Sequence, residues 1–449
     1  MTVKSRDSSA EWRQLWYLVY AFGVAAILVF WWRATGHATI GTTYSVNLAI
    51  GNITGLIGAY AILWELVLLG RLPVLENVFG MEKLTVLHKW NGYTALTLIL
   101  VHALTLTIGF AAADHYSLLH QFLAFNTTWA DILKSTVGTI LLIVIVGMSV
   151  GIVRRGYKYE TWYYVHLFTY LAILLAFGHQ FSDGSDFVGQ PLFIVFWRDL
   201  YIVTAALLLF FRFFRPVYLM FRHQFKVARV VQETPDVVSV YISGRHLDKF
   251  KFVPGQFVIW RFFTKDGWWQ AHPFSFSTAP NPKYLRLTAK AVGDYTKTLP
   301  SLRPGTWVSV DGPHGNFTTS RLTMPSLLMI AGGSGITPIR AMLERLPAVV
   351  KDLVVIYAVR TRRDLALAKE IEPLVAARGG QVKYLLSKEQ APGFGHGILN
   401  SANLDHLVPD VASREIMLCG PPAMTDSVVA MLKKRGIDHH HIHTERFAY

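Results

Sequence analysis

The chain has 449 residues, 52% of them apolar, and its 43 lysines and arginines against 29 acidic residues give a net charge of +14. Its length predicts two or three domains. The basic residues flank long apolar runs in the first half, so we assign the charge to a rim that faces membrane lipid and expect no nucleic-acid partner. The one cysteine, Cys419, excludes a disulfide within the chain.

Six apolar segments of the first half are long enough to cross a bilayer. They run from about 15 to 32, 48 to 69, 84 to 110, 135 to 153, 161 to 181 and 191 to 214. The lysines and arginines of the short loops fall mainly on one side, against Arg33 and Lys134 on the other. This bias predicts a multi-pass protein of the plasma (inner) membrane with both termini in the cytoplasm. Because no small-residue cleavage site follows the first segment, we expect it to be a retained anchor.

The first two segments carry few charges, and we assign them a packing role only. Glu65, near the cytoplasmic end of the second segment, can extend its carboxylate to the membrane interface. The fourth segment has no charge and is predicted to be scaffold.

Four histidines stand out in the third and fifth segments. His88 and His102 are fourteen positions apart, and His166 and His179 are thirteen apart. An ionisable side chain at membrane depth is costly and marks a functional site by default, although a hydrogen-bonded core histidine is the alternative for each. Imidazole ligates iron well, and two facing helices can hold a flat haem between them. Fourteen helical residues rise roughly 21 Å, so the pairs predict two haems b at two depths, an inner one on His88 and His166 and an outer one on His102 and His179.

The angular positions of the second pair fit less well. On an ideal helix His166 and His179 point about 140° apart, whereas His88 and His102 lie within roughly 40° of one face. We therefore expect a bend or bulge near Gly178, the residue before His179; the alternative is that the pairing is wrong.

Two polar groups on the outer side have two interpretations each. Arg198 and Asp199 interrupt the sixth segment, where they form an interfacial ion pair or Arg198 faces an outer haem propionate or the electron acceptor. The loop from 111 to 134 contains His115 and His120, which contact a metal complex or are plain solvated residues.

After Arg215 the pattern changes to short alternating strands, which predict an antiparallel β-barrel from 221 to about 319. Within it, the stretch HPFSFST from His272 to Thr278 can place hydroxyls and backbone donors along a flavin, with Phe274 against its ring. Lys290 and the turn from Gly293 to Thr296, which opens a helix, suit a pyrophosphate.

From Leu327 the pattern is strand, Gly-rich turn and helix, followed by further strands, which predicts a doubly wound parallel sheet. The glycines after the first strand permit close approach of a phosphate, and Pro338 suits the first helical turn. Arg360, Arg362 and Arg363 follow the next strand, so they bind a 2′-phosphate and favour NADPH, or they form a solvated basic loop. The histidines from 439 to 443 suggest a metal cluster but are better explained as the turn into the last strand.

In this order the features resemble the ferric reductase and NADPH oxidase superfamily of transmembrane flavocytochromes. The resemblance covers nearly the whole chain and rests on the histidine pairs, HKWNGY from His88, HPFSFST, the GDYT turn, AGGSGITP, CGPPAM and the terminal ERF. In that family the thirteen-residue spacing of the fifth segment is usual. The implied domains are a six-helix two-haem bundle (1–215), an FAD-binding β-barrel (216–320) and an NAD(P)-binding α/β domain (321–449).

The resemblance also implies roles for individual residues. Flavin contacts fall on His272, Pro273, Phe274, Ser275, Ser277, Lys290, Gly293, Tyr295 and Thr296. Nicotinamide dinucleotide contacts fall on Gly332, Gly333, Gly335, Thr337, Pro338, Arg360, Arg362, Cys419, Gly420 and Pro421. Ser275 and Cys419 are implied at the reacting centre, together with a closing aromatic that is Phe447 or Tyr449.

The expected activity is therefore NAD(P)H-dependent oxidoreduction. Electrons pass from cytoplasmic NADPH or NADH through FAD and two haems b to an acceptor outside, a ferric chelate or molecular oxygen. A haem-free, membrane-anchored flavin reductase and an electron donor to a partner protein are the alternatives. No obligatory protein partner is expected.

Overall fold

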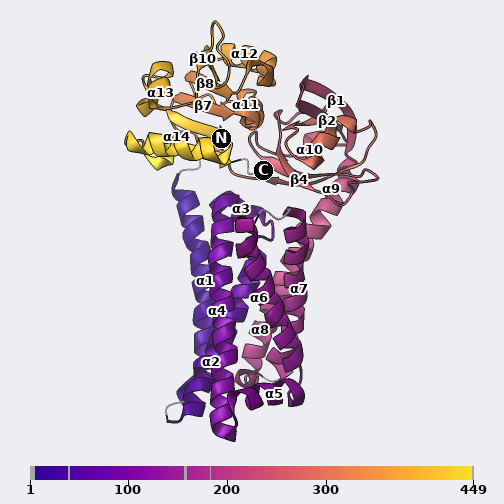
Figure 1. Cartoon of the computed structure of the whole chain (residues 1–449), viewed down its shortest axis with the longest axis vertical. Coiled ribbons are helices and arrows are strands. Elements are labelled where there is room, and N and C mark those ends of the chain that lie inside the picture. The colour runs from indigo at the N-terminus through magenta and orange to yellow at the C-terminus, as the bar shows by residue number, and fades with distance from the viewer. Residues whose placement is uncertain (1–5, 39–40, 156–158, 183, 447–449) are drawn as a thin grey trace. The chain divides into compact units, whose positions relative to one another are not determined.

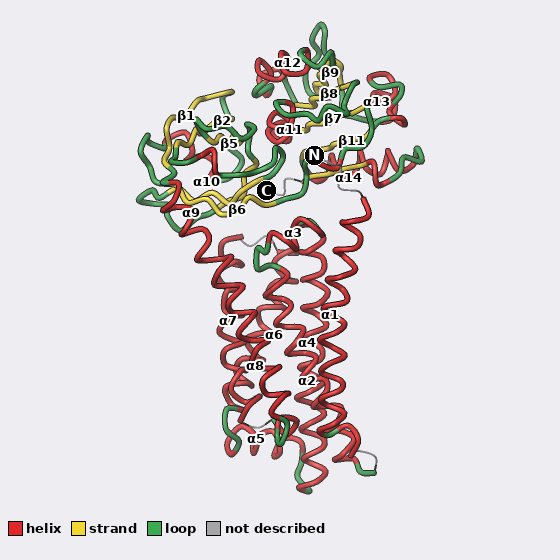
Figure 2. Tube along the Cα trace, turned by 180° about the vertical axis from the view of Figure 1, so that it is seen from behind, coloured by secondary structure: helices red, strands yellow, loops and turns green. Residues whose placement is uncertain are grey.

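The computed structural model describes residues 6–38, 41–155, 159–182 and 184–446, and the chain divides into two compact units, Met1–Leu209 and Phe210–Tyr449. The first unit is helical and the second contains all the strands assigned in the described residues, as Figure 2 shows by colour.

The first unit contains the long apolar helices (Figure 1). Its α-helices are α1 Arg6–Ala34, α2 Thr43–Leu68, α3 Pro73–Phe79, α4 Met81–Asp114, α5 Leu118–Thr128, α6 Ile132–Arg155, α7 Tyr159–Ser182 and α8 Pro191–Leu208. Six stretches are long and apolar enough to span a membrane: 11–34, 43–68, 81–114, 132–150, 161–182 and 191–223. All six predicted spans are confirmed.

Helix α2 packs closely against α4, and α6 packs against α7. Three glycines make the first contact possible, because a Cβ on Gly51, Gly55 or Gly58 would lie 2.5 Å from Leu106, 2.4 Å from His102 and 3.0 Å from Ile99, respectively. Small residues that let two helix backbones approach are typical of membrane helix pairs. The backbone of α2 therefore lies directly against the histidine-bearing face of α4.

The second unit begins with a π-helical turn, Leu209–Phe214, and α9, Arg215–His223. Six strands follow: β1 Lys226–Thr234, β2 Val237–Ser243, β3 Phe257–Phe262, β4 His272–Ser275, β5 Leu285–Lys290 and β6 Val308–His314. They form two antiparallel sheets, β1-β2-β5 and β4-β3-β6, with isolated bridges Lys226 to Trp307 and Phe276 to Leu287. Alternating strand residues such as Val240, Trp260 and Phe276 fill the core, and the predicted β-barrel is confirmed.

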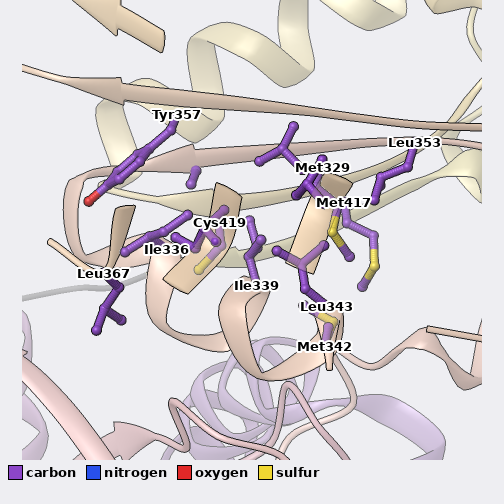
Figure 3. Packing of buried hydrophobic residues seen from close by; sticks show 14 of the residues in the cluster. Met329, Ile336, Ile339, Met342, Leu343, Leu353, Tyr357, Leu367, Met417 and Cys419 are labelled. Atoms are coloured by element: carbon purple, nitrogen blue, oxygen red, sulfur yellow. The ribbon is translucent and has the colours of Figure 1, made fainter. Parts of the chain in front are cut away.

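The third group of strands is a parallel sheet of order β10-β9-β8-β7-β11-β12. Its strands are β7 Ser326–Gly332, β8 Asp352–Val359, β9 Gln381–Leu386, β10 Gly395–His396, β11 Glu415–Gly420 and β12 Ile442–Arg446, with helices α11 Ile336–Leu343, α12 Ala368–Ala376, α13 Ser401–Leu407 and α14 Pro422–Lys434. Continuous burial of β7 and β11 is expected for strands covered on both faces, and Figure 3 shows Met329, Met417 and Met342 in this core. The doubly wound sheet is confirmed, with its strand order reversing between β8 and β11 on either side of β7.

Candidate functional site

The four histidines form the two predicted pairs. The ring centres of His88 on α4 and His166 on α7 are 6.0 Å apart, and those of His102 and His179 are 6.3 Å apart. A metal–imidazole bond of about 2 Å on each side, plus about 1.1 Å from each nitrogen to its ring centre, places two imidazoles that share one metal about 6 Å apart. Both pairs therefore fit a haem iron between them.

Of the bend or bulge expected in the fifth span, the bulge is wrong and the bend stays a prediction. Helix α7 is α-helical throughout, including Gly178. Because α4 packs mainly on α2 and α7 on α6, the imidazoles reach across a gap between two helix pairs. On an ideal helix, His166 and His179 each point about 70° away from the direction that faces α4, one to either side. Rotation about their χ angles can turn both rings toward α4, and we attribute the pairing to this rotation.

The packing-only role assigned to the second span needs correction, because α2 supplies a partner to both histidines of α4. Glu65 Oε2 lies 2.5 Å from His88 Nδ1, and the Gly51 carbonyl oxygen lies 2.7 Å from His102 Nδ1. With His102 Nδ1 donating to the Gly51 carbonyl, Nε2 of that ring is left as the lone-pair nitrogen that a metal needs, and the Glu65 carboxylate brings a negative charge to the Nδ1 side of His88. Sequence reasoning placed Glu65 at the membrane interface and missed this contact.

The outer polar groups have contacts that fit their simpler interpretations. Arg198 donates to Asp199 at 2.9 and 3.0 Å, and both side chains are about half exposed, as expected of an ion pair, while a contact of Arg198 with a haem propionate or the acceptor stays a prediction. His115 ends α4 in a left-handed conformation, and the ring of the exposed His120 packs on Tyr116 at 4.1 Å.

In the β-barrel, β4 places the HPFS stretch beside α10, Asp294–Thr298. The His272 ring stacks on Tyr295 at 3.8 Å, and Tyr295 is nearly parallel to Phe274 at 6.5 Å. Burial raises the pKa of Tyr295, so its phenol stays protonated. Trp260 Nε1 donates to the Phe274 carbonyl at 3.0 Å and holds β4 on the barrel. These rings form an aromatic surface of the kind that packs against a flavin.

Two residues assigned to the flavin already have local partners. Ser277 is fully buried, and its Oγ accepts from Arg286 Nε at 3.0 Å and from Thr288 Oγ1 at 2.8 Å. Thr296 Oγ1 accepts from the Gly293 amide at 3.0 Å, so this turn caps itself. The flavin contacts of these residues stay predictions.

Lys290 lies beside the Gly-rich turn of the parallel sheet. Its Nζ is 3.0 Å from both Asp236 and Asp364, and it lines a small pocket with Thr288, Gly333, Ser334 and Thr337. Burial alone would lower the pKa of Lys290, but hydrogen bonds to the two aspartates raise it above its usual value. The charged ammonium group is thus held next to the amides that follow β7.

The three glycines of the turn differ in what surrounds them. A Cβ on Gly335 would lie 2.1 Å from the Cys419 carbonyl, and one on Gly332 would lie 2.4 Å from Met424 Sδ. Gly333, at φ +54°, has open space around it and adopts a left-handed conformation that favours glycine. Close approach of the β11 backbone therefore explains Gly335, the side chain of Met424 on α14 crowds Gly332, and Gly333 is the one placed to admit a phosphate.

Cys419 is the penultimate residue of β11, and its side chain is fully buried in the apolar core (Figure 3). Burial raises the pKa of its thiol well above the ordinary value. Pro421 is the N-cap of α14. Phe447 and Tyr449, the two candidates for the closing aromatic, lie outside the described residues.

The basic run after β8 is partly paired. Arg362 donates to Glu389 through its backbone amide at 2.9 Å and through Nε at 2.6 Å, whereas Arg360 is exposed. A carboxylate therefore orients the backbone and side chain of Arg362 at the carboxyl end of the sheet, where nucleotides bind in this fold.

The histidines before β12 form the predicted turn, His439–His441, and His443 lies in the strand. His443 Nε2 is 2.8 Å from Oε1 of the buried Glu415, which also accepts the amides of Thr323 and Met324 at 2.7 and 3.0 Å. Burial alone would raise the pKa of Glu415, but these hydrogen bonds lower it below its usual 4.5.

Glu415→Gln should destabilise the second unit at neutral pH and make its stability less sensitive to acid. A carboxyl whose folded pKa is depressed stabilises the fold above its unfolded pKa and loses this contribution as pH falls through the folded value. We expect thermal midpoints of the wild type and the variant to differ at pH 7 and to converge below pH 4.5. A constant difference across this range would contradict the role of Glu415.

A cluster of charges joins the barrel to the parallel sheet. Arg286 on β5 is 1% exposed and donates to Glu370 on α12 at 2.9 and 3.0 Å, and Arg340 on α11 lies 2.7 Å from the same carboxylate. Arg340 also donates to the Ser277 carbonyl at 3.1 Å. Sequence reasoning missed this cluster, because its members are far apart in the chain and carry no motif.

Comparison with known proteins identifies three domains. Residues 54–177 match the ferric reductase like transmembrane component, 222–317 an FAD-binding domain, and 329–430 an oxidoreductase NAD-binding domain.

Individual relatives resemble about half of the chain. It is 31% identical to the glycine betaine monooxygenase reductase subunit of Chromohalobacter salexigens, over 50% of this chain and 64% of that protein. It is 27% identical to an NADPH oxidoreductase of Mycobacterium tuberculosis, over 50% of this chain and 59% of that protein. The solved structure of the FAD/NAD binding domain of a nitric oxide dioxygenase from Vibrio cholerae matches with a TM-score of 0.45 and 23% identity. The match covers 50% of this chain and 97% of that structure. The chain covers less than two thirds of the length of either of the first two proteins.

Proposed function

Because the chain has the domain architecture of the ferric reductase and NADPH oxidase superfamily, we propose that it carries electrons across a membrane. The donor is NADPH or NADH in the cytoplasm, the route is FAD and two haems b, and the acceptor lies on the opposite side. When bound, the flavin takes two electrons as a hydride and releases them singly to haem iron.

The single observation that carries the proposal is that four histidines of the apolar helices form two pairs, with ring centres 6.0 and 6.3 Å apart. His88 and His166 would hold the inner haem, and His102 and His179 the outer one. In the second unit, the His272, Phe274 and Tyr295 rings would support the flavin. Lys290 would contact the flavin phosphate, and the amides around Gly333 would hold the phosphates of the nicotinamide dinucleotide.

The acceptor is a small molecule, either a ferric chelate or oxygen, which would leave as superoxide. Because His88 with His166 and His102 with His179 would each occupy both ligand positions of a haem iron, we expect the acceptor to take its electron at the haem edge. We favour the ferric reductase slightly.

A second candidate is electron delivery to a partner protein. Relatives that cover half of the chain are named as reductase subunits of monooxygenases, which favours it. A pull-down from native membranes tests this function directly.

A visible spectrum of the detergent-purified full-length chain, before and after anaerobic NADPH, tests the proposal. Two b-type haems per chain that NADPH reduces are expected. Flavin bands without haem would contradict it and leave a membrane-anchored flavin reductase. Acceptor kinetics with oxygen and a ferric chelate, with and without superoxide dismutase, then separate the two acceptors.

Arg362→Ala should raise the KM for NADPH about tenfold or more and leave the KM for NADH nearly unchanged. A hydrogen bond to a charged group contributes about 1.5–3 kcal/mol, and the 2′-phosphate is present only on NADPH. The matched control is Arg345→Ala, which removes an exposed arginine that donates to the Pro280 carbonyl instead. Equal changes for both nucleotides would assign Arg362 to the solvated loop.

A further inference from the structure

Glu65 is an acidic side chain held against the inner histidine of α4. Its carboxylate lies 2.5 Å from His88 Nδ1 and also accepts from the Asn91 side-chain amide. Asn91 is fixed in turn by donating to the Ala61 carbonyl at 2.8 Å. A Cβ on Gly92 would approach Glu65 Oε2 to 3.2 Å, so the glycine leaves room for the carboxylate. With its side chain 14% exposed, Glu65 is enclosed by these groups.

The outer histidine of the same helix has a different partner. His102 Nδ1 faces a neutral oxygen, the Gly51 carbonyl, at 2.7 Å. A carboxylate in contact with the ring brings a full negative charge to it, which a neutral carbonyl does not. Such a partner makes the imidazole a more basic ligand, and a more basic ligand favours ferric over ferrous iron. The two histidines are thus built to be electronically unequal.

We propose that Glu65 is a positioning residue that lowers the reduction potential of the inner haem below that of the outer haem. This inference rests on the proposed function. In the step concerned, the haem held by His88 and His166 would be oxidised by one electron and the haem held by His102 and His179 would be reduced by the same electron. The contact between Glu65 and His88 would remain in place and no proton would be transferred. Glu65 makes this outward step favourable.

Glu65→Gln tests the proposal in the full-length protein, since glutamine keeps the shape and removes the charge. Redox titration of the haem absorbance should show the inner midpoint potential raised and the outer one unchanged. Loss of a partner of this kind changes a metal site about tenfold, which for one electron is about 59 mV. A His102→Leu variant, which should retain only the inner haem, assigns the two midpoints. The matched control is Asp199→Asn, a carboxylate of the same unit that pairs with Arg198.

The outcomes separate the role of Glu65 from the proposed function. A wild type with two haems and a Glu65→Gln variant with unshifted midpoints, or with both midpoints shifted equally, overturns the role of Glu65 alone. A wild type without haem overturns the proposed function as well. If Glu65→Gln loses the inner haem, Glu65→Asp decides. Return of that haem with an inner midpoint below the outer one supports the proposal, and a wild type whose inner midpoint is not below its outer one overturns it.

Discussion

Replacing His102 with leucine is expected to remove the outer haem and leave the inner one in place. Leucine fills a similar volume but has no ligating atom, so the outer iron would keep only His179. Haem content should fall to half, and the remaining haem should still be reduced by NADPH. Electron transfer to an impermeant acceptor outside sealed vesicles should fall more than about 100-fold, since even changes to partners of metal ligands cost about 10- to 100-fold.

The control is His120→Gln, which changes an exposed histidine of α5 that contacts Tyr116. This variant should keep both haems and the full rate. Two intact haems in His102→Leu would show that the pairing of His102 with His179 has a purely structural origin, as in a hydrogen-bonded core.

Replacing Glu370 with glutamine should give the largest loss of stability in the second unit. Its carboxylate faces two guanidinium groups, Arg286 and Arg340, of which Arg286 is almost fully buried. Removing one partner of a buried pair costs about 3–5 kcal/mol, because the remaining charge is left uncompensated. We expect about 3 kcal/mol, since the Glu370 side chain is 33% exposed.

The measurement is the thermal release of flavin fluorescence from the full-length protein. A loss of this size should lower the midpoint by about 6–12 °C in a unit of this length. Glu372→Gln, on the same helix, is the control, because Glu372 is exposed and accepts only from Tyr384 at 2.6 Å among the contacts described. Similar midpoints for both variants would show that the cluster between barrel and sheet contributes little.

The parts of the fold that follow from local patterns were predictable. Span length, strand alternation and the strand–turn–helix order gave the six spans, the barrel and the doubly wound sheet. The histidine pairing also followed, because the similar spacings of fourteen and thirteen residues set matching depths. The expected bulge was wrong, since helix phase alone ignores how far an imidazole can reach across a gap.

The contacts that surround the site were not predictable. From the sequence alone, Glu65 is predicted to lie at the membrane interface. Its contact with His88 joins residues of two different helices and becomes visible only when α2 is packed against α4. Ser277 lies in a motif that suggests a ligand contact, but its hydroxyl is used by Arg286 and Thr288. Gly335 suggests a phosphate turn, although the Cys419 carbonyl alone demands a glycine there. Each depends on tertiary neighbours that no local pattern specifies.

The glycine contact between α2 and α4 bears on how the protein responds to its lipid. Gly51, Gly55 and Gly58 bring the α2 backbone against α4 over the stretch that includes His102, so the two helices behave as one stiff rod. Bilayers differ in thickness, and a span adapts by tilting or by deforming the lipid at modest cost. Tilting a rod moves His88 and His102 together. The separation between these two histidines is therefore set by the protein, and membranes of different thickness should leave it unchanged.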